Sequence, residues 1–405
     1  MNLNDLLKVT FEKRASDLHI KVGVPPILRI DGKLTPMETE KRLTQEDAMG
    51  IAVGIMNPAQ KAKFTEKNEL DMAYAVPGLG RFRVNVFKQR GSVGMVFRLV
   101  PAKILNFEEL MLPTVLAKIA SEQRGLIMVT GTTGSGKSTT LAAMIDYINT
   151  TRTANIVTIE DPIEFLHRDK KSIVNQREVG ADTYSFGDAL RSALRQDPDV
   201  ILVGEMRDFE TISIALTAAE TGHLVLSTLH TLDAAETINR IISVFPPYQQ
   251  KQIRMQLASV IKGIVSQRLV ARADGKGRVA AVEVMLGTMS VREAIINEDK
   301  TRQVPTIISA GLTHYGMQTF DQSLLMLYKK GLITYEEALV TATNPDDFAL
   351  KVKGIQSTSD MALEENDAKK PGAKPLGVPS RFGSQPAKPG EAKDSDFKID
   401  RFGDK

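Results

Sequence analysis

The fold of this chain is decided by the stretch Gly131-Thr132-Thr133-Gly134-Ser135-Gly136-Lys137-Ser138. It matches the Walker A pattern, in which two glycines enclose four residues and Lys and Ser follow. An apolar run, Leu126 to Thr130, precedes it, and a helical pattern from Thr139 to Asn149 follows it. A strand, a glycine-rich loop and a helix in this order are the setting that the pattern requires, so the sequence predicts a phosphate-binding loop.

Each residue type in this loop has an expected task. The glycines let successive backbone N–H groups face phosphate oxygens, and the following helix adds free donors and a positive dipole end. Lys137 is expected to contact the β and γ phosphates, and the Ser138 hydroxyl to bind Mg²⁺. The predicted ligands are therefore ATP and Mg²⁺. The residues expected to bind the nucleotide are Gly131, Thr132, Thr133, Gly134, Ser135, Gly136, Lys137, Ser138 and Thr139.

Further short apolar runs predict a mainly parallel sheet covered by helices, that is, an α/β fold. They are Ile156 to Ile159, Val200 to Val203 and Leu224 to Ser227. Ser185 to Asp188 has capping-box spacing before a predicted helix that ends near Gln196. Beyond Tyr248 we expect helices, with a charged turn at residues 274–277.

A second element of the site is predicted at Asp199-Val200-Ile201-Leu202-Val203-Gly204-Glu205, an apolar strand that ends in an acid. It is similar to a Walker B element but has Gly204 where an aspartate usually stands. Glu205 is then suited to a water-mediated Mg²⁺ contact or to activation of the attacking water. A helix-capping or surface role for Glu205 is the alternative.

Acidic residues also follow another predicted strand, in the segment Glu160-Asp161-Pro162-Ile163-Glu164. Parallel strands end at the same edge as the phosphate loop, so this cluster is expected to face the nucleotide. Glu164 could act as the general base toward the attacking water. The alternative is a solvated acidic turn.

Two histidines flank one predicted strand, His223 before it and His230 after it. Opposite ends of a strand cannot share a metal ion. His230 is expected at the phosphate edge, where a hydrogen bond could report the γ-phosphate. A packed or solvated histidine is the alternative.

The patterns divide the chain of 405 residues into parts. Residues 1–100 combine a helical pattern with a hairpin at 27–34 and two alternating strands at 81–87 and 93–100, which predicts an α+β domain. Residues 101–107 read as a linker, with a helix expected from about 108 to 121. The ATPase domain is predicted at 108–354, and 355–405, rich in Pro, Gly and charge, as a disordered tail.

Composition limits the function classes. With 52 Lys and Arg against 49 Asp and Glu, the net charge of +3 does not favour nucleic acid as a partner. The chain has no Cys, so thiolate metal sites and thiol nucleophiles are excluded. No apolar run approaches the ~18 residues of a membrane span. We therefore expect a cytoplasmic protein.

Three of these segments together resemble the signature boxes of secretion-superfamily ATPases. Thr158 to Glu164 looks like the Asp box, Asp199 to Asp208 the Walker B element and Ser227 to Thr231 the His box. Residues 15–19, 265–269 and 316–322 are similar to the PilT/PilU branch, the type IV pilus retraction ATPases. The resemblance covers about residues 5 to 350.

The resemblance implies more than the residues show. It implies a PAS-like N-terminal domain, a RecA-like P-loop ATPase domain and a homohexamer with nucleotide between the domains. Arg83 and Arg98 match the arginines that close over the phosphates in the family. The implied partners are an inner-membrane pilus platform protein and a PilT/PilU paralogue. The protein would act at the pilus base, on the cytoplasmic side of the inner membrane.

Related functions remain open at this point. The chain could be an accessory PilU-type paralogue, because members of both branches share these motifs. A pilus-extension or type II secretion ATPase is a further alternative. Those relatives usually carry a longer N-terminal region and a four-cysteine zinc insertion, and this chain has no cysteine.

Overall fold

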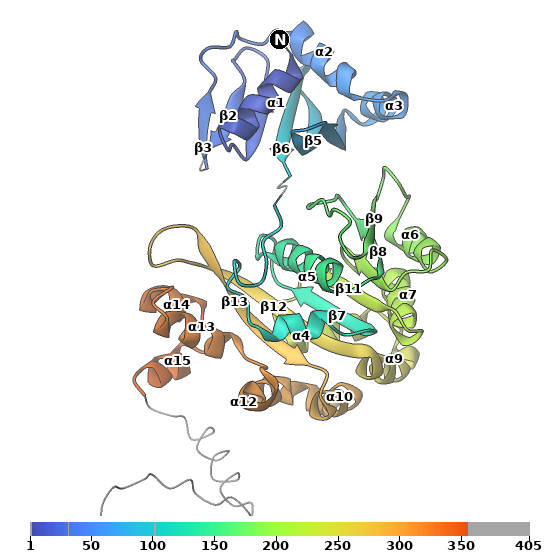
Figure 1. Ribbon diagram of the computed structural model, residues 1–405, viewed down its shortest axis with the longest axis vertical. Coiled ribbons are helices and arrows are strands. Elements are labelled where there is room, and N and C mark those ends of the chain that lie inside the picture. Colours follow the sequence, from blue (N-terminus) through green and yellow to red (C-terminus); the bar gives the residue numbers. More distant parts are fainter. Residues whose placement is uncertain (1, 31, 101–102, 355–405) are drawn as a thin grey trace, which may run out of the picture. The chain divides into compact units, whose positions relative to one another are not determined.

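The computed structural model describes residues 2–30, 32–100 and 103–354 (Figure 1). The fold is mixed α/β and contains two sheets, one in the first hundred residues and one in the remainder. The predicted disordered tail at 355–405 lies outside the described residues. The domain limits proposed from the sequence stay a prediction.

The first sheet has six antiparallel strands in the order β3-β2-β1-β6-β5-β4. They are β1 (Asp17–Ile20), β2 (Ile27–Ile30), β3 (Lys33–Pro36), β4 (Glu69–Val76), β5 (Gly80–Gln89) and β6 (Ser92–Leu99). The accompanying helices are α1 (Leu3–Glu12), α2 (Gln45–Ile55) and α3 (Pro58–Lys67). The predicted first helix, the hairpin and both later strands are confirmed.

One face of this sheet packs on its own core. Leu18, Leu28, Val84 and Phe97 are buried there together with Leu7 of α1. Because side chains alternate along a strand, the residues next to them point to the other face. That other face carries polar and charged residues, including Arg83 and Arg98.

The second sheet has seven strands in the order β13-β12-β7-β11-β10-β8-β9, and all but β13 run parallel. They are β7 (Gly125–Thr130), β8 (Asn155–Glu160), β9 (Ile173–Glu178), β10 (Val200–Val203), β11 (Leu224–Leu229), β12 (Ile261–Ala271) and β13 (Arg278–Leu286). The four strands expected from apolar runs are confirmed, and so is the mainly parallel sheet.

Helices cover both faces of this sheet (Figure 1). Met128 of β7 packs into a different core cluster from its neighbours Ile127 and Val129. The helices are α4 (Val115–Ala120), α5 (Lys137–Thr151), α6 (Phe186–Ala193), α7 (Phe209–Glu220), α8 (Ala234–Ser243), α9 (Pro247–Val260), α10 (Met289–Ile296), a 3₁₀ turn η1 (Glu298–Gln303), α11 (Val304–Ala310), α12 (Leu312–Tyr315), α13 (Phe320–Lys329), α14 (Tyr335–Thr341) and α15 (Pro345–Val352).

Two sequence predictions were wrong in detail. The region after Tyr248 is not all helical, because β12 and β13 form a hairpin whose turn contains the expected charged residues, with Gly275 and Gly277 at φ 68° and 85°. A buried strand and a buried helix can give the same apolar run, which explains the error. The helix expected from 108 begins only at Val115, since Pro113 interrupts the backbone hydrogen bonding.

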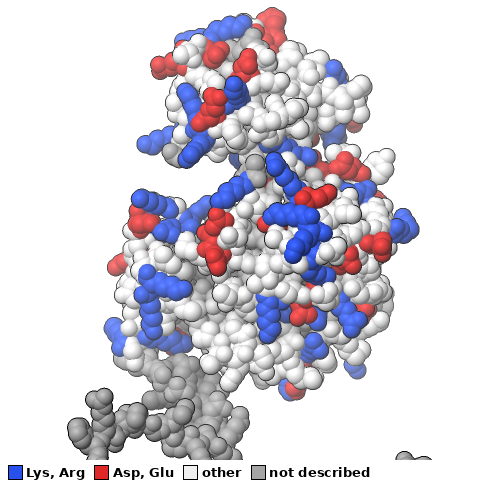
Figure 2. Space-filling view, in the orientation of Figure 1, with Lys and Arg blue, Asp and Glu red and all other residues white. Residues whose placement is uncertain are grey.

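The surface carries charges of both signs. On the face that Figure 2 shows, Lys and Arg are interspersed with Asp and Glu. Among the described residues, no helix combines the length and the apolar character needed to cross a membrane.

Candidate nucleotide-binding site

The loop between β7 and α5 needs its glycines. Gly131, Gly134 and Gly136 have φ values of 138°, 79° and 96°, in a region that side chains disfavour. A Cβ on Gly131 would lie 2.5 Å from the Gln267 carbonyl oxygen and 2.6 Å from the Ser135 hydroxyl. The loop can therefore pass this close to β12 only with glycine at position 131.

Lys137 lies buried at the start of α5, with 9% of its surface exposed. Its ammonium group donates to the carbonyl oxygens of Gly131 and Thr132 at 2.8 and 3.0 Å. Burial lowers the pKa of Lys137, and the negative charges of Glu164 and Glu205 counteract part of this shift. The lysine is thus held inside its own loop, within electrostatic reach of two carboxylates.

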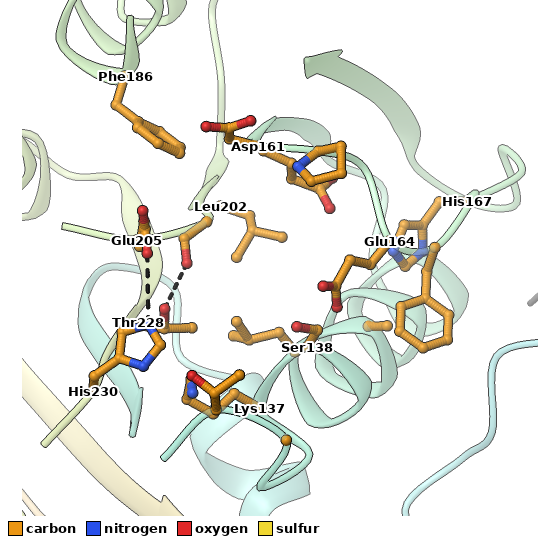
Figure 3. Close-up of a pocket in the computed structure, with 18 residues that line it drawn as sticks. Lys137, Ser138, Asp161, Glu164, His167, Phe186, Leu202, Glu205, Thr228 and His230 are labelled. Carbon is orange, nitrogen blue, oxygen red and sulfur yellow. Dashed lines mark hydrogen bonds and ion pairs between the residues drawn. The ribbon is translucent and has the colours of Figure 1, made fainter. Parts of the chain in front are cut away.

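A pocket opens beside this lysine (Figure 3). Its lining comes from the phosphate loop and from the carboxyl ends of β8, β10 and β11, as expected for a parallel sheet. It includes Lys137, Ser138, Glu160, Asp161, Glu164, Glu205, Thr228 and His230. The predicted loop, acid cluster, Walker B acid and histidine therefore meet at one place.

The residues present fit a nucleotide and a hard cation. The Ser135 hydroxyl is buried and has no hydrogen-bond partner in the described structure, so a donor in the loop is left for a phosphate oxygen. The Ser138 hydroxyl and, through water, the Glu205 carboxylate offer oxygen atoms of the kind that Mg²⁺ prefers.

Gly204 explains the departure from the usual Walker B pattern. Its N–H donates to the Ile159 carbonyl oxygen at 2.8 Å, and a Cβ would lie 3.2 Å from that oxygen and 3.4 Å from the Glu160 Cα. A side chain at this position would press on the neighbouring strand end. The carboxylate at the end of this strand is therefore that of Glu205, the next residue.

Glu205 lies between Arg207 and His230. Its Oε2 is 2.8 Å from Arg207 Nη2 and 3.6 Å from His230 Nε2. Two hydroxyls tie the strand ends together, because Ser227 donates to the Val203 carbonyl and Thr228 to the Gly204 carbonyl, both at 2.7 Å. These bonds fix the His230 segment against the Glu205 segment.

The acid cluster is braced from the edge strand β9. Gln176 donates through Nε2 to Glu160 Oε1 at 3.1 Å and to the Phe165 carbonyl at 2.8 Å, while its Oε1 accepts from the His167 N–H at 2.8 Å. Burial raises the pKa of Glu160, against hydrogen bonds from Thr158 and Gln176 that lower it. The loop that carries Glu164 is thereby anchored at both ends.

Sequence reasoning missed His167, Phe165 and Phe186, which also line the pocket. Burial lowers the pKa of His167 to about 4, and its Nδ1 has no partner among the described atoms. The only signal was its position in the loop after β8, seven residues beyond Glu160.

The two predicted arginines are not part of this pocket. Arg83 on β5 and Arg98 on β6 lie opposite each other on the outer face of the first sheet. Arg98 pairs with Asp17, and no hydrogen bond or ion pair joins Arg83 to another described residue. Their role at the phosphates stays a prediction.

Comparison with known proteins identifies the family. Residues 2–306 match the model of the type II/IV secretion system protein family. The type IV pilus retraction ATPase PilT of Pseudomonas aeruginosa is 49% identical over 348 residues, covering 86% of this chain and 100% of that protein. The type IV pilus ATPase PilU of the same organism is 45% identical over 361 residues, covering 89% and 94%.

A solved structure agrees with the sequence match. The crystal structure of the pilus retraction motor PilT with bound ADP superposes with a TM-score of 0.80 at 48% identity, covering 85% of this chain and 98% of that one. The fold, the pocket and these relatives together show that the chain is an ATPase that belongs to the PilT/PilU family of type IV pilus retraction ATPases.

Proposed function

We propose that this chain is the Mg²⁺-dependent ATPase subunit of a homohexameric motor that retracts type IV pili and so supports twitching motility. The observation that carries the proposal is the pocket in which Lys137, Ser138, Glu164, Glu205 and His230 meet. Retraction follows from the relatives, since PilT is named a retraction ATPase and the family is shared.

The phosphate loop would bind ATP. Backbone N–H groups of residues 131–139 and the N-terminus of α5 face the phosphates. Lys137 exchanges its two carbonyl partners for β- and γ-phosphate oxygens, which keeps its charge compensated in a buried place. Mg²⁺ held by Ser138 and, through water, by Glu205 would neutralise charge on the β and γ phosphates.

Hydrolysis needs a base close to the γ-phosphate. Glu164 would take a proton from the attacking water, and its position in the pocket lining and its charge near Lys137 support this role. Glu205 would orient that water or the metal's water shell. His230, 3.6 Å from Glu205, would sense whether the γ-phosphate is present.

Arg83 and Arg98 would complete the site by closing over the phosphates. A guanidinium group matches phosphoryl oxygens in shape and charge. Closure with ATP and reopening after hydrolysis would convert the chemical step into movement of one unit against another.

The motor would act at the pilus base on the cytoplasmic face of the inner membrane, against an inner-membrane platform protein and with a PilT/PilU paralogue as a further partner. The PilU relative at 45% identity supports an accessory PilU-type role as the second candidate. A pilus-extension ATPase is the less favoured alternative.

Deletion of the gene tests the direction of the motor. Abundant surface pili without twitching are expected, and loss of pili would show an extension role instead. Complementation with Lys137→Ala should fail, whereas Lys118→Ala, an exposed lysine of α4 outside the pocket, should restore twitching. Twitching restored by Lys137→Ala would refute the ATP-driven mechanism.

A further inference from the structure

Four charged residues form a row across neighbouring strands of the first sheet. Asp17 on β1 is directly opposite Arg29 on β2 and Arg98 on β6, and Arg98 is directly opposite Arg83 on β5. Directly opposed residues share a face of the sheet. The row therefore holds three guanidinium groups and a single carboxylate on the face turned away from the core.

Asp17 is the buried member of this row, with 3% of its surface exposed. Its Oδ1 accepts from Arg98 Nε at 2.8 Å, and its Oδ2 accepts from the Ser16 hydroxyl at 2.8 Å. Arg29 Nε lies 3.8 Å from the same Oδ2. Both oxygens are thus held, so the carboxylate presents a fixed acceptor to Arg98.

The arginines on either side of Asp17 differ in what is left for a ligand. Arg29 uses Nη1 to donate to the Gly32 carbonyl at 2.8 Å, in the turn between β2 and β3. Arg98 uses only Nε, its side chain is 66% exposed, and its two Nη groups have no partner among the described residues. Arg29 is engaged by the fold, whereas the outer donors of Arg98 are available.

A hydrogen bond from Nε restricts how the guanidinium group can turn, and it leaves the Nη donors for another acceptor. The Asp17 carboxylate also lies between Arg29 and Arg98, whose positive charges would otherwise repel each other across the strands. An arginine fixed in this way loses less freedom when it binds an anion.

We propose that Asp17 is a positioning residue that orients Arg98, beside Arg83, to present paired donors to the phosphoryl group of ATP. This inference rests on the proposed closure of Arg83 and Arg98 over the phosphates and adds the residue that prepares one of them. The same bonds would also suit a purely structural ion pair, so the test must separate these roles.

The test is a double-mutant cycle on the full chain. Asp17→Ala, Arg98→Gln and the double variant are compared for kcat and KM of ATP hydrolysis, together with Tm and oligomer size. Asp17→Ala is expected to lower kcat by roughly tenfold to a hundredfold, as misplacement of a catalytic group does. The double variant should be no slower than Arg98→Gln alone, because Asp17 acts through Arg98. Asp71→Ala, an exposed acid that pairs with Asn85 on the same sheet, is the matched control and should keep wild-type kcat.

The outcomes separate the two ideas. If Arg98→Gln lowers kcat but Asp17→Ala keeps wild-type kcat, the positioning role is overturned, and the proposed closure of the arginines over the phosphates still stands. Losses that multiply in the double variant also overturn it, since they make Asp17 a structural residue. Wild-type kcat for Arg98→Gln overturns both proposals.

A second variant keeps the test valid if Asp17→Ala does not fold. Arg98→Lys leaves the buried acid and a positive partner in place but removes the planar outer donors. We expect kcat to fall about as far as in Arg98→Gln. Wild-type kcat in Arg98→Lys would show that the orientation of the guanidinium group has no role, and the inference would be wrong.

Discussion

Glu205 and His230 lie at the ends of adjacent parallel strands, with Oε2 of the acid 3.6 Å from Nε2 of the imidazole. The register that places Val203 opposite Ser227 sets this approach, and the Ser227 and Thr228 hydroxyls fasten it. The two strand ends are therefore held together at the edge of the sheet. This contact links the proposed water-handling acid to the proposed sensor of the γ-phosphate.

Glu205→Gln keeps the size of the side chain and removes its charge. We expect ATP to bind with little change, because the phosphate loop is untouched, and kcat to fall by about 10²-fold or more. Nucleotide binding by fluorescence and phosphate release measure the two effects. Glu336→Gln, at an exposed glutamate of α14, is the control. A Glu205→Gln protein with wild-type kcat would remove Glu205 from the mechanism.

His230→Ala tests whether the histidine works through Glu205. It should lower kcat less than Glu205→Gln does, since the acid remains in the pocket. In the Glu205→Gln background, His230→Ala should cost nothing further, because the two residues act as a pair. Steady-state rates of both single variants and the double variant provide the measurement. Independent losses that multiply would contradict the coupling.

Much of this site was predictable because its parts follow strands. Glycine spacing fixes the phosphate loop, and parallel strands carry their following residues to one edge, so Glu164, Glu205 and His230 could be placed beside Lys137 without coordinates. The bracing by Gln176 and the lining by Phe186 depend on loop paths and on β9 lying at the sheet edge. No local pattern encodes such contacts.

The first sheet shows the same limit. Alternation predicted strands around Arg83 and Arg98, but the register that aligns them with Asp17 comes from pairing between distant segments. The hairpin of β12 and β13 was missed because a buried strand has no period of two. Tertiary pairing, not local propensity, decided both.

Gly204→Ala tests the steric reason for the unusual Walker B element. The added Cβ would meet the Ile159 carbonyl at 3.2 Å, so the strand ends must shift. We expect a loss of about 1–3 kcal/mol in unfolding free energy, as for other overpacked sites. Urea unfolding measures this. Gly50→Ala, in α2 with nothing within 4 Å of the new Cβ, should instead stabilise by about 1 kcal/mol. Equal effects of both substitutions would contradict the steric argument.

Glu283 should make stability depend on pH. The pKa of Glu283 is raised from 4.5 to about 7, chiefly by burial; Asp233 and Asp321 contribute to the rise, and the Ala234 N–H and Arg268 oppose it. The folded chain keeps the proton where the unfolded chain releases it, so the stabilising contribution is complete below pH 4.5 and is lost as pH rises toward 7.

Glu283→Gln should remove this loss, because an amide can still accept from the Ala234 N–H. We expect the variant to match wild type near pH 4.5 and to exceed it by up to about 3 kcal/mol above pH 7. Chemical unfolding across this range measures the difference, with exposed Glu66→Gln of α3 as control. If the difference in unfolding free energy between Glu283→Gln and wild type stayed constant with pH, the raised pKa would be wrong.

Gln176→Leu should weaken catalysis from outside the reacting groups. The change removes three part-buried hydrogen bonds that hold Glu160, Phe165 and His167, at a cost of about 1–3 kcal/mol. Glu160 keeps its bond from the Thr158 hydroxyl. The Glu164 loop would then sample other positions, so kcat should fall about tenfold while ATP affinity, which depends on the phosphate loop, changes little. Asn175→Leu on the same strand loses a single exposed bond to Asn155 and should keep wild-type kcat. If Gln176→Leu lowered Tm but left kcat unchanged, the brace would serve stability alone, and Glu164 would owe its position to the rest of the loop.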